Sequence, residues 1–183
     1  MAPAGGTFLI ADPFLKDPNF ARTVVLLCEH QAEGSFGFVI NRPFQQTLNE
    51  LLLDVEDMQS IPLYFGGPVQ PDTVHFIHQY PDLIENSYEV GEGIYWGGNF
   101  EQTLELIQMG LIDIRKIKFF IGYSGWGGGQ LEAELEEHSW IVSPAYPELV
   151  FHGQQEMIWQ QSLRELGDEY ALMANFPIDP SLN

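Results

Sequence analysis

The hydrophobic pattern along the chain predicts short strands separated by turns, with a few amphipathic helices between them. The strand segments are apolar or alternating runs bounded by Gly, Pro, Asn or Asp. One run, Ala21–Glu29, is apolar on both faces, which is typical of a central strand. The predicted strands are Thr7–Ala11, Ala21–Glu29, Phe36–Asn41, Ile61–Phe65, Thr73–His78, Tyr88–Val90, Ile94–Trp96, Ile114–Tyr123 and Ser139–Ser143.

Helical periodicity appears in four places. Thr47 and Asn99 are placed to cap two helices, each with a residue three positions on that suits a first turn. The apolar stripes of these two helices are Leu48, Leu51, Leu52 and Val55, then Phe100, Leu104, Ile107 and Leu111. Two further helices are expected at Gln130–Glu137 and Gln155–Leu166. Strands and helices do not alternate strictly, so the predicted class is α+β with a largely antiparallel sheet, in one domain over residues 1–183.

The segment Phe119–Trp140 contains more glycine than a simple core requires. Its five glycines are expected to form a tight turn between a strand and a short acidic helix. A phosphate-binding loop is not predicted, because the Lys-Ser/Thr pair of a P-loop is missing and the following helix is rich in glutamate. Ser124 lacks the second flanking glycine of a nucleophile elbow, since Trp126 occupies that position.

The charge balance bears on the kind of partner. Seven Lys and Arg against 26 Asp and Glu give a formal net charge of −19, which disfavours direct nucleic-acid binding and favours cationic partners. Three of the cations, Arg115, Lys116 and Lys118, are expected to pair with the glutamate-rich helix. No signal peptide and no membrane-spanning run is evident, so a cytoplasmic protein without membrane contact is expected.

Candidate catalytic and metal-binding residues give weak signals. Cys28 and His30 share a strand face, but the apolar run around Cys28 favours a buried, inert thiol. The histidines have no metal-ligand spacing, so neither a metal nor a cofactor is predicted. An enzymatic alternative stays open: a hydrolase or transferase using His30 with a nearby carboxylate, which requires a concave pocket with His30 or Cys28 exposed in it.

Five longer motifs together resemble the YqgE/AlgH family of bacterial proteins over nearly the whole chain. They are LIADPFLKDPNFARTVVLLCEH from Leu9, GFVINRP from Gly37, FGGPV from Phe65, GGNFEQ from Gly97 and GYSGWGGGQLEAEL from Gly122. The resemblance implies an α+β fold whose strongly bent sheet forms a partial barrel with flanking helices, and it implies no known reaction. One family member was named as a regulator of alginate gene transcription. With this charge and no helix-turn-helix signal, any such regulation is expected to be indirect. The chain departs from the family pattern at Gly128 and His152.

The predicted function is therefore a non-catalytic cytoplasmic binding or regulatory module that acts through a protein or small-molecule contact. Its site is expected where three turns converge: Asn41–Pro43, Gly66–Pro68 and Tyr123–Gln130. In that site Arg42 would contact an anion or carboxylate, Trp126 would form a flat apolar wall, and Gln130 would be a polar anchor. The alternative is that Arg42 pairs with a neighbouring Glu and Trp126 fills the core.

Overall fold

The structure is a computed structural model that describes residues 1–52 and 58–175. Within these residues the strands are β1 (Thr7–Ala11), β2 (Val24–Gln31), β3 (Gly34–Val39), β4 (Pro43–Thr47), β5 (Pro62–Phe65), β6 (Val69–His78), β7 (Tyr88–Gly91), β8 (Ile94–Trp96), β9 (Ile117–Gly127) and β10 (Trp140–Pro144). The helices are α1 (Leu48–Leu51), α2 (Phe100–Gln108), α3 (Gln130–Glu136), α4 (Pro147–Val150), α5 (Ile158–Arg164) and α6 (Asp168–Met173). Two single 3₁₀ turns, η1 (Ile114–Lys116) and η2 (Gln155–Met157), precede β9 and α5.

The strands form one curled sheet in the order β10-β1-β2-β3-β9-β6-β8-β7. β9 lies at its centre and pairs with β3, β5 and β6. Its pairing with β5 is parallel, and the other strand pairs in the described part of the chain are antiparallel. The predicted α+β class with a largely antiparallel bent sheet is confirmed.

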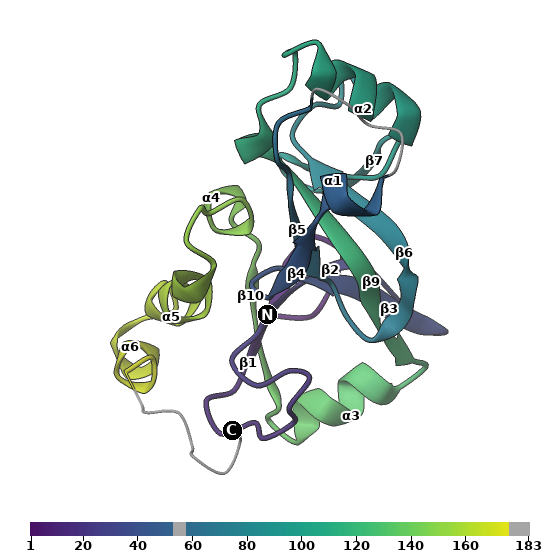
Figure 1. Cartoon of the computed structure of the whole chain (residues 1–183). Coiled ribbons are helices and arrows are strands. Elements are labelled where there is room, and N and C mark those ends of the chain that lie inside the picture. Colours follow the sequence, from purple (N-terminus) through teal and green to yellow (C-terminus); the bar gives the residue numbers. More distant parts are fainter. Residues whose placement is uncertain (53–57, 176–183) are drawn as a thin grey trace.

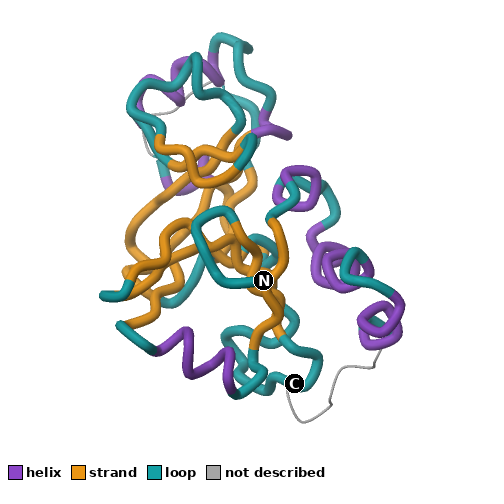
Figure 2. The backbone as a smooth tube through the Cα atoms, turned by 180° about the vertical axis from the view of Figure 1, so that it is seen from behind, coloured by secondary structure: helices purple, strands orange, loops and turns teal. Residues whose placement is uncertain are grey.

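The sheet curls until β7 approaches the residues just before β1. There Gly6 and Gly91 meet backbone to backbone, and a Cβ on Gly6 would lie only 2.9 Å from the Cα of Gly91. The sheet is thus a half-barrel. In Figures 1 and 2, α4, α5 and α6 lie along one side of this sheet, with α2 at one end of the molecule and α3 at the other.

Three hydrophobic clusters hold these layers together. The first packs the inner side of β1, β2, β3 and β9 against α4 and α5. The second lies between β5, β6 and β9 and the helices α1 and α2. The third lies on the outer side of β1, β2 and β3, under α3 and the loop after β1. Burial of these apolar faces is the main term that stabilises the fold.

Most predicted elements appear in the structure, with shifted ends. The sequence pattern does not predict β4, α4 or α6, and the helix from Thr47 is described only as the single turn of α1. Val55, the last residue of its predicted stripe, lies outside the described residues. Leu111, predicted to face inward from α2, is instead 52% exposed, because α2 ends at Gln108 and Gly110 turns the chain.

The glycine-rich segment differs most from its prediction. β9 does not end at Tyr123 but continues to Gly127, so that Gly122 and Gly125 lie inside a strand. Gly122 has a φ of +67°, and a Cβ there would collide with the carbonyl oxygen of Gly67. This residue is needed for a close backbone approach in the middle of the sheet rather than for a turn before a helix.

The positive φ at Gly122 also changes which side of the sheet the next residues face. Before it, Phe119 and Ile121 pack in the second cluster while Phe120 packs in the first. Strict alternation would place Tyr123 with Ile121. Instead Tyr123 packs on the first cluster, on the same side as Phe120.

Candidate functional site

A cavity of about 650 Å³ opens on the half-barrel between β3, β6, β8 and the second half of β9. We call it the aromatic cavity. Its lining residues are Glu29, Glu33, Gly34, Ser35, Phe36, Val69, His75, Trp96, Tyr123, Gly125 and Trp126. A volume of this size is typical of sites for small organic molecules.

The aromatic side chains of the cavity are held in fixed mutual geometry. Phe36 on β3 packs edge-on against Trp96 on β8, with ring centroids 5.0 Å apart, and against Tyr123 on β9 at 6.1 Å. Beneath them the buried ring of Phe38 stacks on Phe120 at 4.9 Å. Each ring is therefore supported by another ring, which preorganises an apolar surface for a flat ligand.

His75 is the polar side chain between these rings. Burial lowers the pKa of its imidazole, so the ring is neutral at neutral pH. The Thr73 hydroxyl donates its one hydrogen to the carbonyl oxygen of Gln70, 2.7 Å away, and therefore accepts from His75 Nε2 at 2.9 Å. The proton of the neutral ring is thus on Nε2, and Nδ1 is a hydrogen-bond acceptor without a partner among the described residues.

Two carboxylates, Glu29 and Glu33, complete the lining. Glu33 is exposed, and Glu29 is partly buried and accepts a 2.7 Å hydrogen bond from Gln31 Nε2. Together with the neutral His75 acceptor they make the cavity a place for hydrogen-bond donors and positive charge. An anionic ligand would meet repulsion there.

Arg42, one of the three residues predicted for a site, holds a loop within the protein. Its Nη1 and Nη2 donate 3.0 Å hydrogen bonds to the carbonyl oxygens of Pro18 and Ala21. Burial lowers its pKa, and the charge of Asp17 works in the opposite direction. The guanidinium therefore fixes the loop after β1 against the sheet, and its partners are carbonyls rather than the glutamate that the alternative interpretation named.

Trp126 and Gln130, the other two predicted residues, meet through a third residue. Glu134 on α3 accepts hydrogen bonds from the indole nitrogens of Trp126 and Trp140 on one oxygen, at 3.1 and 2.9 Å, and from Gln130 on the other at 3.0 Å. Gln130 also accepts from the backbone N–H of Gly127 at 3.0 Å. The structure thus brings Trp126 and Gln130 together, while the Arg42 side chain forms its hydrogen bonds with Pro18 and Ala21 instead.

The three predicted turns do converge, but in a packed arrangement. The Phe65 N–H donates to the Arg42 carbonyl at 2.8 Å, and Ser124 Oγ donates to the Gly66 carbonyl at 3.0 Å. A Cβ on Gly67 would collide with the backbone of Tyr123. Backbone therefore fills the contact between the turns, and the larger cavity lies beside it. The sequence reasoning did not single out Phe36, His75, Trp96 or Tyr123.

His30 does find a carboxylate, as the enzymatic alternative requires. Its Nε2 lies 3.1 Å from Glu132 Oε1 and its Nδ1 lies 2.5 Å from Ser35 Oγ. However, His30 does not line the aromatic cavity, and Cys28 is buried with the pKa of its thiol raised by burial. Ser35 does line it, but beside Glu29 and Glu33, whose charges would oppose an oxyanion formed at Ser35.

The remaining candidates have structural roles. His78 is fully buried and satisfied by the backbone of Tyr80 and Gly97 and by Ser87 Oγ. The predicted pairing of the basic cluster with the glutamate-rich helix is wrong for two of its members, since Arg115 pairs with Asp113 and Lys118 is buried under the C-terminal helices. Among the described residues no group of three His, Cys, Asp or Glu side chains could hold a metal. No helix of that part of the chain is long and apolar enough to span a membrane.

Comparisons with known proteins agree on one family. A sequence model of the AlgH-like family matches residues 8–171. A UPF0301 protein of Chlorobium limicola is 47% identical over 97% of this chain and 95% of its own length. A UPF0301 protein of Cytophaga hutchinsonii is 42% identical over 97% of this chain and 98% of its own length.

Solved structures show the same fold. The solution structure of the AlgH protein from Pseudomonas aeruginosa is similar with a TM-score of 0.76 and 33% identity, over 98% of this chain and all of the other. A crystal structure of a protein from Corynebacterium diphtheriae, with a TM-score of 0.81 over 96% and 94% of the chains, has 24% identity and supports the fold alone. None of these names states a reaction or a ligand.

Proposed function

The chain belongs to the AlgH-like family, and we propose that it is a non-catalytic cytoplasmic binding module that holds a flat, amine-bearing small molecule in the aromatic cavity. The observation that carries this proposal is the combination of aromatic walls packed edge to face, a neutral His75 acceptor and two carboxylates around one opening. Of the three residues predicted from the sequence, the proposal retains Trp126, which lines this cavity. Arg42 and Gln130 keep the structural roles described above.

The chemistry of the walls defines the ligand. Aromatic faces attract both flat apolar groups and cations, because the ring quadrupole is negative on its face. His75 Nδ1 accepts a hydrogen bond from a donor such as an amine or a ring N–H. Glu29 and Glu33 add Coulomb attraction for a positive group, and the net charge of −19 raises the local concentration of cations over the whole surface.

A regulatory role fits this proposal only indirectly. The same negative field opposes approach to a phosphate backbone, so direct nucleic-acid binding is not part of the proposal. Regulation would instead follow from a ligand that changes the contact between this protein and another. A bound ligand can shift such an equilibrium only by the difference in its affinity for the two states.

The test compares three probes that share one ring system and differ in charge. Tryptamine is cationic, 3-methylindole is neutral and indole-3-propionate is anionic. We expect tryptamine to raise the melting temperature most and indole-3-propionate least. At a hundredfold excess over its dissociation constant a ligand stabilises by about 2.7 kcal/mol, which corresponds to roughly 5–10 °C for a domain of this size.

Matched variants assign the effect to the cavity. Exchanging both Glu29 and Glu33 for Gln should remove the preference for tryptamine and leave binding of 3-methylindole unchanged. Glu136→Gln, on the exposed side of α3, makes the same kind of change away from the cavity and should leave the preference intact. Equal shifts for all three probes, or a tryptamine preference that survives the double exchange, would contradict the proposal.

A further inference from the structure

Lys118 lies in the first half of β9 with its amine in the protein interior. The residue is only 4% exposed. Its Nζ donates a 2.7 Å hydrogen bond to Gln155 Oε1 and a 3.0 Å hydrogen bond to the carbonyl oxygen of Val150. The same nitrogen lies 4.3 Å from the centroid of the Tyr64 ring. No carboxylate pairs with it within residues 1–52 and 58–175, which is unusual for a buried lysine.

A second cavity, separate from the aromatic cavity, is lined in part by Lys118. It has a volume of about 250 Å³ and lies between β5, the start of β9 and the segment from Phe151 to Gln155. Lys118, Tyr64 and Gln155 form its polar part, Ile61 and Phe151 belong to its apolar part, and Arg115 also lines it. We call it the lysine cavity.

The surroundings favour the neutral amine. Burial lowers the pKa of Lys118 to about 7, and burial also raises the pKa of Tyr64, so that its phenol stays protonated. The charged or titratable side chains that line the cavity besides these two are Arg115 and His152, and neither offers a negative charge. A neutral amine has two hydrogens, and Gln155 and Val150 accept both. Its lone pair is then left for another atom.

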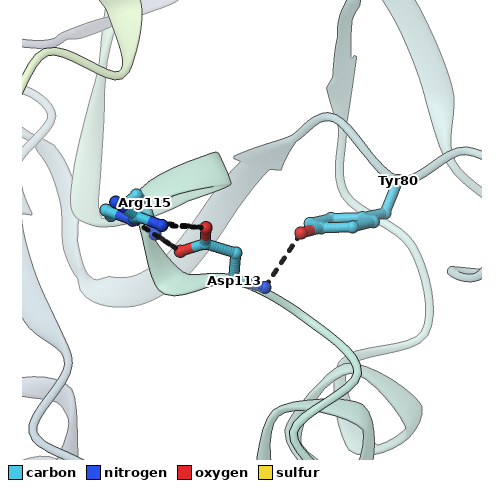
Figure 3. Close-up of polar contacts among 3 residues, drawn as sticks. All are labelled: Tyr80, Asp113 and Arg115. Carbon is cyan, nitrogen blue, oxygen red and sulfur yellow. Dashed lines mark hydrogen bonds and ion pairs between the residues drawn. The ribbon is translucent and has the colours of Figure 1, made fainter.

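Arg115 is fixed at this cavity by its neighbour. Asp113 accepts from Arg115 Nε and Nη2, with Nη2 at 2.9 Å from Oδ2, and its backbone N–H donates to the Tyr80 hydroxyl at 2.9 Å. In Figure 3 the guanidinium and the Tyr80 ring lie on opposite sides of Asp113. The third guanidinium nitrogen, Nη1, is in none of these bonds, and the Arg115 side chain is 86% exposed.

We propose that Lys118 is a covalent capture site for small carbonyl compounds, which it binds as an imine in the lysine cavity. The Nζ lone pair attacks the carbonyl carbon, and a proton moves from nitrogen to the carbonyl oxygen to give a carbinolamine. The oxygen then leaves as water with a second proton, and the C=N bond forms. An amine and a carbonyl give an imine and water, with no change of oxidation state and no further reactant.

This site is independent of the aromatic cavity and of the function proposed for it. The compound must be small, because the lysine cavity has well under half the volume of the aromatic cavity. The bound compound is either an uncharged aldehyde or a 2-oxo acid whose carboxylate contacts Arg115. Both classes contain a reactive carbonyl group, and one probe of each class distinguishes them.

The experiment treats the full chain at about pH 7.5 with glyoxylate or with propanal, in the presence of cyanoborohydride, which reduces an imine to a stable amine. Peptide mapping by mass spectrometry then gives the rate of modification at each lysine. Lys116, exposed and two residues away, is the internal reference. At this pH an amine with a pKa of about 7 has a neutral fraction roughly three orders of magnitude above that of a lysine in a model peptide. Allowing for the buried position of Lys118, we expect it to react at least about tenfold faster than Lys116.

Two controls make the outcome decisive. In urea-unfolded protein the preference for Lys118 should disappear, because it depends on the folded environment. Lys116→Met should leave the modification of Lys118 unchanged, and Lys118→Met should abolish it. Faster reaction with glyoxylate assigns the site to 2-oxo acids, and faster reaction with propanal assigns it to uncharged aldehydes. Modification of Lys116 at an equal or higher rate in folded wild-type protein overturns the proposal, whatever the stability of the variants.

Discussion

Replacing Lys118 by Met should change how the free energy of unfolding depends on pH. In the folded protein the pKa of Lys118 is about 7, and in the unfolded chain it returns to about 10.4. Between these values the unfolded chain binds one more proton than the folded protein, so stability rises with pH. Below about pH 7 both states are protonated, and the folded state has the full cost of a buried charge. The destabilising effect is therefore largest in acid and is relieved as the pH rises.

The size of the effect follows from the pKa difference. Each pKa unit corresponds to about 1.36 kcal/mol, and the gain accumulates at that rate per pH unit between the two pKa values. From about pH 6 to about pH 9 the folded protein passes from mostly charged to neutral at Lys118. The expected gain in stability from this residue is about 2 to 3 kcal/mol. Gln155 and the backbone of Val150 hold the amine in both forms, while Arg115 and His152 line the same cavity in wild type and variant alike.

The assay is urea unfolding at four pH values across this range, for the wild type, Lys118→Met and Lys116→Met. Subtracting each variant from the wild type removes the titration of all other groups. The difference for Lys118→Met should increase by about 2 to 3 kcal/mol from the acid to the alkaline end. The difference for Lys116→Met, an exposed lysine on the same segment, should stay constant to within about 0.5 kcal/mol, as expected for a surface side chain.

A result that refutes this reasoning is easy to recognise. The free energies of unfolding of the wild type and Lys118→Met would then differ by the same amount at every pH. In that case the pKa of Lys118 is ordinary, and groups other than Gln155 and Val150 compensate for its burial. A constant loss of stability in the variant would report only the two lost hydrogen bonds. The change of this stability difference with pH, and not its size at any one pH, tests the lowered pKa of Lys118.

Two further predictions concern the fold around the proposed sites. Glu134→Leu leaves two largely buried indole N–H groups without an acceptor and should lower the free energy of unfolding by about 3 kcal/mol, whereas Glu134→Gln keeps an acceptor and should cost about 1 kcal/mol, both read from urea unfolding. Gly122→Ala should cost more than about 3 kcal/mol, because its positive φ is combined with a collision against Gly67. Gly110→Ala is its control in thermal unfolding, because φ is also positive there, at +74°, but no atom lies within 4 Å of the added Cβ. The expected loss of stability is about 1 kcal/mol. Equal losses of stability at both glycines would contradict the role of the close backbone approach.

The elements of the fold could largely be predicted because their signals are local. The apolar run of β2, the Asn99 cap of α2 and the inward-facing Trp159 and Leu163 of α5 all depend on residues close in sequence. The ends of elements were less accurate where a partner from far along the chain decides them. β9 extends past Tyr123 because β3 pairs with it as far as Gly127, and no local pattern contains that pairing.

The sites were predicted less well, for the same physical reason. Gln130 follows a run of glycines and Arg42 lies in an Asn-Arg-Pro turn, but both side chains form hydrogen bonds within the protein. Lys118 follows Arg115 and Lys116 closely in the sequence, which is typical of a cluster of surface cations. It is buried only because the segment around Val150 and Gln155, more than 30 residues later, folds over it. Period-two alternation predicts that His75 lies on the face opposite Phe76. It does not predict that His75 lies next to Trp96 and Tyr123, because these residues come from three separate strands.

Gly122 connects the fold to the function proposed for it. Without its left-handed backbone, Tyr123 would follow Ile121 into the second cluster, and the aromatic cavity would lack one wall. With it, the part of β9 before the glycine presents Lys118 and Phe120, and the part after it presents Tyr123. Phe120 lies between them and contacts both Phe38 under the aromatic cavity and Tyr64 in the lysine cavity, at 4.9 and 6.2 Å between ring centroids. One central strand thus contributes to both cavities on a shared aromatic core, and Gly122 matters through the side chain that it orients.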